Sequence, residues 1–202
     1  AVGMAIAERR LAARFNRPGF PVVDHRTYVI ASDGDLMEGI THEACALAGH
    51  LGLGKLIVLW DDNGISIDGP TSLAFSEDVL ARVQAYGWRA QRLDGHDPAA
   101  LAEALRTAQA ETTRPALIAC RTHIGYGSPN RQDSEKAHGE PLGAEEVRLT
   151  KQWLGWPSDL DFHVPEEVRE LMRRAGTAGA EQHRQWKELL TGYAAAHPDL
   201  AQ

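Results

Sequence analysis

The sequence has few cysteines, no long apolar run and no signal sequence. Its two cysteines, Cys45 and Cys120, each lie in an apolar stretch of the 202-residue chain. We therefore expect two buried free thiols in a reducing, cytoplasmic compartment, rather than a disulfide or a metal pair. No stretch of about 18 apolar residues occurs, which argues against a membrane span. The first residues also lack the pattern of a signal peptide.

The chain also lacks a dense block of basic residues. Its formal net charge is −7, and the 21 Lys and Arg residues are dispersed. Nucleic acid binding depends on a concentrated basic surface, so the charge pattern argues against nucleic acid as a partner. A few backbone amides and a metal ion suffice to hold a small anion, so the acidic balance is compatible with an anionic ligand.

Hydrophobic residues make up 43% of the chain, enough for a substantial core, and the length fits a single domain over residues 1–202. Residues 2–8 have the pattern of a helix already under way, with no initiator Met and no capping residue before it. We therefore expect the chain to be part of a longer protein.

Short apolar runs rich in strand-forming residues alternate with helical patterns along the first two thirds of the chain. Such alternation predicts an α/β fold, a parallel β-sheet with helices on both faces. The expected strands are 27–31, 56–60, 88–93 and 116–121. The expected helices are 2–15, 38–51, 77–86, 97–110, 144–154, 165–174 and 180–196, and the segments 32–39, 61–76 and 130–143 are expected to be loops.

Two turn-like motifs follow neighbouring strands. Asp33-Gly34 comes after the first strand and Asn63-Gly64 after the second. Each motif alone is common in turns, but together at strand ends they suit a ligand, since open α/β sheets bind ligands beyond the carboxyl ends of their strands. Mg²⁺ prefers oxygen ligands, which the Asp33 carboxylate, the Asn63 amide and a carbonyl just past Asn63 can provide. Gly34 lets its N–H approach a phosphate.

Residues 33–43 (Asp-Gly-Asp-Leu-Met-Glu-Gly-Ile-Thr-His-Glu) and 61–69 (Asp-Asp-Asn-Gly-Ile-Ser-Ile-Asp-Gly) resemble the transketolase version of the thiamine-diphosphate motif. The resemblance implies thiamine diphosphate with Mg²⁺, or Ca²⁺ or Mn²⁺ in its place. It places the metal on Asp33, Asn63 and the carbonyl of Ile65, and the diphosphate on the N–H of Gly34. The implied fold is the diphosphate-binding (PP) module, truncated at its N-terminus.

Two positions depart from the general thiamine motif, which begins Gly-Asp-Gly and ends Asn-Asn. This chain has Ser32 in place of the first Gly and Asp62 in place of the first Asn. An aspartate is the usual residue at the position of Asp62 in transketolases. Because Ser32 replaces a glycine, the backbone geometry at the end of the first strand is left open by the sequence.

A second stretch with the same resemblance covers residues 124–130 and 137–143, Ile-Gly-Tyr-Gly-Ser-Pro-Asn and Ala-His-Gly-Glu-Pro-Leu-Gly. It implies that His138 contacts the diphosphate and assists proton transfer, a role that suits a histidine near neutral pH. Ile67 and Ile124 would line the thiazolium side of the cofactor, although core packing explains them nearly as well. Four further histidines are interpreted as structural: His42, His50, His96 and His123.

The family resemblance implies transfer of a two-carbon ketol unit from a ketose phosphate to an aldose phosphate, in the pentose phosphate pathway. Transketolases have three domains, and this chain resembles the later part of the first, with residues 144–202 leading toward a pyrimidine domain that carries a catalytic glutamate. The site lies between two subunits, so a homodimer is implied, with Glu38 and Glu43 at its interface. The chain alone is expected to be inactive.

Two alternatives remain at this point. A sister thiamine-diphosphate enzyme, such as dihydroxyacetone synthase or deoxyxylulose-phosphate synthase, would share the motifs, and comparing ribose 5-phosphate with formaldehyde as acceptor would distinguish the former. A non-catalytic chain, or half of a split enzyme that pairs with a separate pyrimidine-domain protein, would share the fold without turnover by itself.

Overall fold

The computed structural model describes residues 1–201, and the chain forms two compact units. The first unit joins Ala1–Ile6 to Arg26–Ser158, and the second joins Ala7–His25 to the chain from Asp159 onward. Helix α1 (Val2–Phe15) therefore begins in the first unit and continues into the second. The expectation of a single diphosphate-binding domain stays a prediction.

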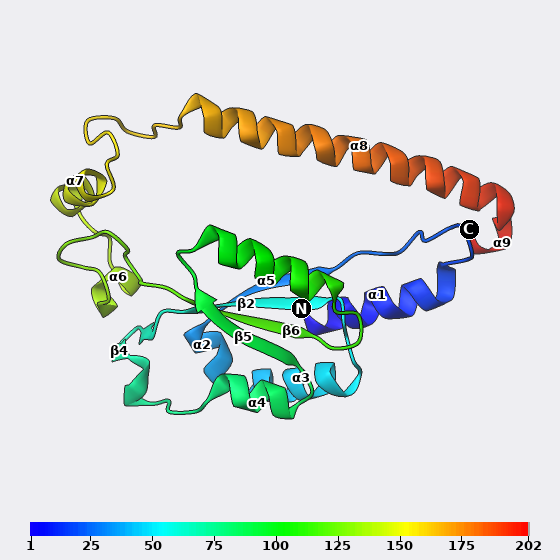
Figure 1. Ribbon diagram of the computed structural model, residues 1–202, viewed down its shortest axis with the longest axis horizontal. Helices are drawn as coiled ribbons and strands as arrows, with labels where there is room; N and C mark the ends of the chain where they lie inside the picture. The colour runs from blue at the N-terminus through cyan, green and yellow to red at the C-terminus, as the bar shows by residue number, and fades with distance from the viewer. Residues whose placement is uncertain (202) are drawn as a thin grey trace. The chain divides into compact units, whose positions relative to one another are not determined.

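A parallel four-stranded sheet in the order β1-β2-β6-β5 forms the centre of the first unit (Figure 1). These strands are β1 (Thr27–Ser32), β2 (Leu56–Asp62), β5 (Arg89–Asp94) and β6 (Ala116–Arg121). The predicted parallel sheet is confirmed, and every predicted strand agrees with an observed one within two residues at each end. Register pairs Ser32 with Asp61 across β1 and β2, so the two strands end side by side.

The sheet is covered on both faces, as the sequence predicts. Alternate residues of β2 belong to two separate apolar clusters. Val58 and Trp60 pack with α1, α3 (Gly39–His50) and α4 (Val79–Ala85), and Ile57 packs with α5 (Pro98–Ala110). Figure 1 shows α5 on one side of the sheet and α3 and α4 on the other. The central strands are buried on both faces, which explains their continuous apolar sequence.

The helix starts follow from capping residues. The carboxylate of Asp97 accepts hydrogen bonds from the N–H groups of Ala99 and Ala100, which confirms it as the N-cap of α5. Asp78 caps α4 in the same way. A side-chain acceptor at the N-cap satisfies amides that the helix itself leaves unpaired, so these residues fix where the helices begin.

Three predicted loops contain regular structure. Segment 32–39 includes the short helix α2 (Asp33–Met37), and segment 61–76 holds a small hairpin of β3 (Ile65–Ser66) and β4 (Gly69–Pro70), followed by a 3₁₀ turn, Thr71–Leu73. Segment 130–143 contains α6 (Glu135–Gly139), which is followed by α7 (Ala144–Trp153). These loop predictions were wrong because elements of two to five residues carry too little periodicity to be recognised.

The second unit contains α8 (Glu166–Ala196) and α9 (Pro198–Ala201). The prediction of separate helices at 165–174 and 180–196 is wrong, because α8 runs without a break through Gly176 and Gly179. A glycine inside a helix costs about 1 kcal/mol but removes no hydrogen bond. Within this unit Phe20 packs edge-on against Tyr193, and the indole N–H of Trp186 donates to the carbonyl of Val22 at 3.0 Å.

No helix in residues 1–201 combines the length and apolar character needed to cross a membrane. Both cysteines are free thiols, Cys120 buried and Cys45 partly buried. Burial raises the pKa of both thiols above the ordinary value for cysteine, so neither side chain has the character of a reactive thiolate.

The junction of α3 with the end of α4 requires a glycine, and this predicts the effect of a substitution. A Cβ at Gly49 would lie 1.8 Å from the carbonyl oxygen of Tyr86. Gly49→Ala should therefore lower the free energy of unfolding by about 1–3 kcal/mol, the usual cost of overpacking, in urea denaturation. Gly39→Ala in the same helix meets nothing within 4 Å and should change it by less than about 0.5 kcal/mol. Equal losses in the free energy of unfolding for Gly49→Ala and Gly39→Ala would contradict this account of the junction.

Candidate functional site

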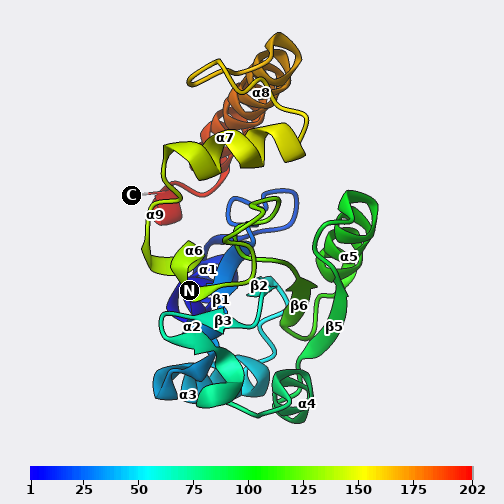
Figure 2. The same cartoon turned by 90° about the vertical axis from the view of Figure 1, so that its left-hand side faces the viewer.

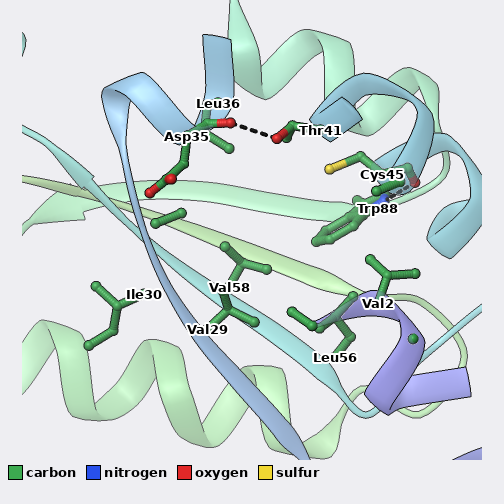
Figure 3. A pocket seen from close by; sticks show the side chains of 14 residues that line it. Val2, Val29, Ile30, Asp35, Leu36, Thr41, Cys45, Leu56, Val58 and Trp88 are labelled. Carbon is green, nitrogen blue, oxygen red and sulfur yellow. Dashed lines mark hydrogen bonds between the residues drawn. The ribbon is translucent and has the colours of Figure 1, made fainter. Parts of the chain in front are cut away.

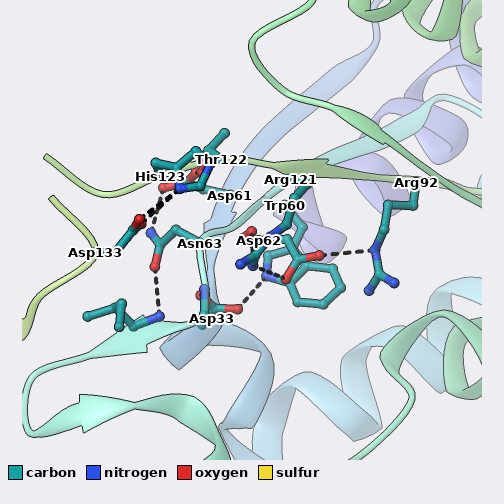
Figure 4. Close-up of polar contacts among 12 residues, drawn as sticks. Asp33, Trp60, Asp61, Asp62, Asn63, Arg92, Arg121, Thr122, His123 and Asp133 are labelled. Carbon is teal, nitrogen blue, oxygen red and sulfur yellow. Dashed lines mark hydrogen bonds and ion pairs between the residues drawn. The ribbon is translucent and has the colours of Figure 1, made fainter. Parts of the chain in front are cut away.

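Asp33 and the Asn63-Gly64 turn meet at the carboxyl edge of the sheet. Asp33 is the first residue of α2, directly after β1, and its Oδ2 accepts a hydrogen bond from the N–H of Gly64 at 2.9 Å. Its Oδ1 accepts another from the indole N–H of Trp60 at 3.1 Å (Figure 4). The two motifs predicted to converge from neighbouring strands are therefore in direct contact.

The Asp33 carboxylate is buried and has only neutral donors. Its exposed fraction is 6%, and no ion pair joins it to a basic side chain within residues 1–201. Burial raises the pKa of Asp33 above its ordinary value. The charge of Asp62 adds to this shift, whereas hydrogen bonds from Gly64, Trp60 and Asn63 oppose it. A buried anion without a charged partner is costly, so this position favours an added cation.

The arginines nearby serve a different carboxylate. Arg92 pairs with Asp62 at 3.1 Å, and Arg121 lies 3.6 Å from the same carboxylate while also donating to the Asp62 carbonyl (Figure 4). The positive charge at this edge of the sheet is therefore directed to Asp62. The Asp33 carboxylate has no basic partner among the described residues and is therefore available to a cationic ligand.

Asn63 is buried and tied into the same edge. Its Oδ1 accepts from the N–H of Ile65 at 2.9 Å, and its Nδ2 donates to Asp61 at 3.1 Å. Asp61 in turn accepts a short hydrogen bond from the hydroxyl of Thr122, directly after β6. The ends of β2 and β6 are therefore linked through one carboxylate, and the amide oxygen of Asn63 keeps a second lone pair for a ligand.

The turn after Asn63 presents a backbone carbonyl. Gly64 has φ +75°, a conformation that favours glycine, and its carbonyl accepts from the N–H of Thr71. Ile65, opposite Pro70, is one residue beyond this bond, and its own N–H turns to Asn63 rather than to β4. By the alternation of an antiparallel pair, the Ile65 carbonyl also faces away from β4, where a ligand can reach it.

The backbone where the chain leaves β1 is unstrained in spite of the change from Gly to Ser. Ser32 is the N-cap of α2 with φ −95° and ψ 173°, an extended conformation open to any residue. Its hydroxyl accepts from the N–H of Asp35, and the Asp35 carboxylate accepts from the N–H of Ser32, forming a capping box. The backbone geometry at Ser32, which was open from the sequence, is therefore that of a normal strand end followed by a helix cap.

Gly34 is exposed, and residues 1–201 leave room for a side chain at this position. A Cβ there would meet only the hydroxyl of Ser32 at 3.9 Å, an ordinary contact, and its φ is not positive. The glycine is thus required neither by a turn nor by tight packing. The open space at this position is compatible with close approach of a ligand to the Gly34 N–H.

The remaining predicted residues lie on the segments that follow β2 and β6. His138 is on α6, which contacts the β3 strand that contains Ile65, and α2 also contacts β3, as Figure 2 shows. The His138 side chain is exposed. Ile67 lies at the tip of the β3–β4 hairpin and is 68% exposed, whereas Ile124 is partly buried. The elements that carry Asp33, Ile65 and His138 are therefore brought together, without a hydrogen bond linking His138 to them.

Glu146 anchors the segment that follows β6, and no motif in the sequence singles it out. It lies in the first turn of α7, is only 9% exposed, and accepts hydrogen bonds from the Ser128 hydroxyl and from the N–H and side-chain amide of Asn130. Acids are common in the first turn of any helix, so Glu145 and Glu146 look alike in sequence. Only the fold distinguishes the exposed one from the buried one.

An apolar cavity of about 440 Å³ lies beside β1, between the start of α1 and α3 (Figure 3). Val29, Val58 and Trp88 are among its lining residues, and neither Asp33, Asn63 nor His138 is. Mostly apolar walls, with the acidic side chain of Asp35 among them, do not repay the desolvation of a charged diphosphate. This cavity is therefore separate from the strand-end site.

The residues present fit a divalent cation and an anionic ligand. Asp33 offers a buried carboxylate, Asn63 an amide oxygen and Ile65 a free-facing carbonyl, the hard oxygen donors that Mg²⁺ and Ca²⁺ accept. No group of three or more His, Cys, Asp or Glu side chains is assembled for a metal in the part of the chain that the structure describes. A site with one carboxylate needs no such group if a phosphate supplies further oxygens.

The fold and the strand-end site define a parallel α/β domain with oxygen donors for a cation at its strand ends, and the comparisons with known proteins give its family. Residues 1–202 match the family described as "Transketolase, thiamine diphosphate binding domain". The chain belongs to this family.

Named relatives agree over the full chain. It is 52% identical over 203 residues to the transketolase of Geobacillus stearothermophilus, covering 100% of this chain and 30% of that protein. Among solved structures, transketolase from Leishmania mexicana has a TM-score of 0.96 at 44% identity, covering 99% of this chain and 30% of that one. A Pichia stipitis transketolase in complex with sedoheptulose 7-phosphate has a TM-score of 0.95 at 42% identity, with the same coverage.

The chain thus spans about 30% of the length of the curated relatives it matches. The sequence resemblance to transketolases and the α/β thiamine-diphosphate-binding fold are confirmed. The individual roles of Asp33, Asn63, Ile65, Gly34 and His138 stay predictions.

The Glu146 contacts predict a pH dependence. Hydrogen bonds from Ser128 and then Asn130 hold the pKa of Glu146 below its ordinary value of 4.5. A depressed pKa means that the carboxylate stabilises the fold above pH 4.5 and that this contribution is lost as the pH falls through the lowered pKa. Glu146→Gln should therefore destabilise the protein at pH 7, and its difference from wild type should shrink as the pH falls toward 3.

The measurement is urea denaturation at several pH values. Glu145→Gln is the matched control, because Glu145 is the neighbouring acid and only pairs with Arg148 at the surface. The hydrogen bond from Arg148 lowers the pKa of Glu145 as well, but exposed pairs contribute little to stability, so this variant should stay closer to wild type than Glu146→Gln at every pH. A difference between wild type and Glu146→Gln that does not change with pH would contradict the assigned contacts.

Proposed function

We propose that this chain is the diphosphate-binding part of a transketolase, which transfers a two-carbon ketol unit from a ketose phosphate to an aldose phosphate. The main observation behind this proposal is the hydrogen bond between Asp33 and the Asn63-Gly64 turn at the carboxyl edge of a parallel sheet. The family match over residues 1–202 supports the cofactor, and the Pichia stipitis transketolases solved with fructose 6-phosphate and sedoheptulose 7-phosphate support sugar phosphates as substrates.

In this proposal Asp33, Asn63 and the Ile65 carbonyl hold a divalent ion, Mg²⁺ or, in its place, Ca²⁺ or Mn²⁺. The N–H of Gly34 donates to the diphosphate, and Ile67 and Ile124 pack beside the thiazolium. The oxygen donor set and the absence of any internal requirement for glycine at position 34 support these assignments.

When bound, thiamine diphosphate supplies the carbanion chemistry, and the protein supplies binding and orientation. The task of Asp33 and Asn63 is to hold the charged end of the cofactor at a fixed point on the sheet edge. His138 lies on an exposed helix next to β3, where its imidazole can donate to a phosphate oxygen or move a proton at a substrate hydroxyl.

The remainder of the site comes from outside this chain. We propose that a pyrimidine domain of the same or a second subunit completes it in a homodimer, with the exposed Glu38 and Glu43 at the interface, and that the enzyme works in the cytoplasmic pentose phosphate pathway. The greater length of the transketolase relatives supports this arrangement. By itself the chain is proposed to have no turnover.

The metal assignment predicts the effect of removing one charge. In the complete enzyme, Asp33→Asn should weaken metal-dependent binding of thiamine diphosphate by more than about 100-fold, the upper end of what outer-shell partners alone cost. Isothermal titration calorimetry with and without Mg²⁺ measures this. Asp35→Asn, in the same short helix but with an exposed carboxylate that bonds only Ser32, should bind normally. Unchanged affinity in Asp33→Asn would refute the proposal.

The histidine assignment predicts a loss of turnover. Replacing His138 by Gln should lower kcat for ketol transfer by about 10²-fold or more, the usual contribution of general acid–base catalysis, with a smaller effect on cofactor affinity. Coupled assays with xylulose 5-phosphate and ribose 5-phosphate would measure kcat. His50→Gln, at the exposed end of α3, serves as the control. Wild-type turnover in His138→Gln would remove His138 from the mechanism.

A further inference from the structure

Trp60 holds the proposed metal carboxylate from inside the sheet. Its indole Nε1 donates to Oδ1 of Asp33 at 3.1 Å, and both residues are buried, with exposed fractions of 5% and 6% (Figure 4). The other oxygen of the carboxylate is held by the N–H of Gly64. The two donors come from different elements, so together they fix the rotation of the carboxylate as well as its position.

The indole lies between two small neighbours in the sheet register and near one guanidinium group. In the sheet register Trp60 is flanked by Ala31 of β1 and Ala119 of β6, two small buried residues that leave room for the ring. The Arg92 guanidinium carbon lies 6.0 Å from the ring centroid while the same side chain pairs with Asp62. A ring packed in this way delivers its N–H at a set direction with little loss of rotational freedom on ligand binding.

The donor is neutral, and this matters for a cation site. A Lys or Arg at position 60 would cancel the charge of Asp33, whereas the indole orients the carboxylate and leaves its charge intact. The two arginines of this edge pair with Asp62 instead. A carboxylate has about four acceptor sites, so Asp33 keeps one beyond the bonds from Trp60, Gly64 and Asn63.

We infer that Trp60 is a positioning residue for the divalent ion: its indole N–H orients the Asp33 carboxylate toward the metal without neutralising it. The inference rests on the proposed function, because it takes Asp33 as the metal ligand. Hydrogen-bond partners of a metal ligand set its orientation, and losing one costs about 10–100-fold in metal affinity.

The test compares two substitutions that differ by one oxygen. In the complete enzyme, Trp60→Phe keeps an aromatic ring but has no donor, and Mg²⁺ affinity at saturating thiamine diphosphate should fall about 10–100-fold. Trp60→Tyr offers a hydroxyl that can reach the carboxylate and should recover most of that affinity. At saturating Mg²⁺ the kcat of Trp60→Phe should return close to wild type, because the residue acts through binding.

Trp88→Phe is the matched control. Trp88 is 3% exposed, and its indole donates to the carbonyl of Cys45 at 2.8 Å, so the same change removes a buried indole bond away from the site. Thermal unfolding should show that both Phe variants lose stability, but only Trp60→Phe should lose metal affinity. Equal metal affinity in Trp60→Phe and wild type, or an equal loss in Trp88→Phe, would overturn the inference.

The outcomes separate this inference from the proposed function. If Asp33→Asn abolishes metal-dependent cofactor binding while Trp60→Phe binds normally, the metal site stands and only the role of Trp60 is wrong. If Asp33→Asn binds normally, the proposed function itself fails. Should Trp60→Phe and Trp60→Tyr weaken metal binding equally, the indole serves packing alone, and the positioning role is refuted.

Discussion

The site depends on one buried carboxylate that joins two turns. Asp33 is the first residue after β1, and it accepts hydrogen bonds from Trp60 within β2 and from Gly64 just beyond β2. Such contacts form only if the two strands pair in the register that sets Ser32 opposite Asp61. A shift of that register would leave a buried anion without its donors, which is among the costlier defects in a protein interior. The strand pairing and the site geometry therefore support each other.

Charge is divided unevenly among the three aspartates at this edge. Asp62 takes both arginines, Asp61 accepts from Asn63 and Thr122, and Asp33 has backbone and indole donors only. No basic side chain in the described part of the chain pairs with Asp33 or Asp61, so two carboxylates without a basic partner lie at this edge of the sheet. Burial raises the pKa of Asp33, and the charge of Asp62 adds to this shift, so the buried carboxylate is electrostatically unfavourable without a cation.

The sequence predicted the parts of this protein that have strong periodicity or a clear cap. Residues 116–121 form a strand with the predicted limits, and Asp97 caps its helix as expected. The meeting of Asp33 with the Asn63-Gly64 turn followed from placing two motifs at adjacent strand ends. The error at α8 has a simple cause: Gly176 and Gly179 weaken a helix without ending it, and only the absence of a left-handed backbone there shows that it continues.

Trp60 and Glu146 escaped prediction for a different reason. Both act through partners far along the chain, 27 residues away for Trp60 and 16–18 for Glu146. In sequence Trp60 is one more apolar residue of a buried strand, and Glu146 is one of two acids at a helix start. Alternation along β2 puts Trp60 on the face of Val58, but which polar group its N–H meets depends on where the neighbouring strand ends. Such roles become visible only when the register is known.

The predicted residues fall into a rigid group and an exposed group, and this division has a physical meaning. Asp33 and Asn63 are buried and fixed by hydrogen bonds to three strand ends. His138 and Ile67 are exposed on a five-residue helix and on a two-residue turn. Anchoring a charged group demands preorganised donors, because reorganisation would consume the binding energy. In the proposed function, the elements that carry His138 and Ile67 contact the rest of a large ligand, where looser elements are tolerated. An exposed isoleucine alone is ordinary, so the exposure of Ile67 acquires a role only if a ligand or a further part of the protein covers it.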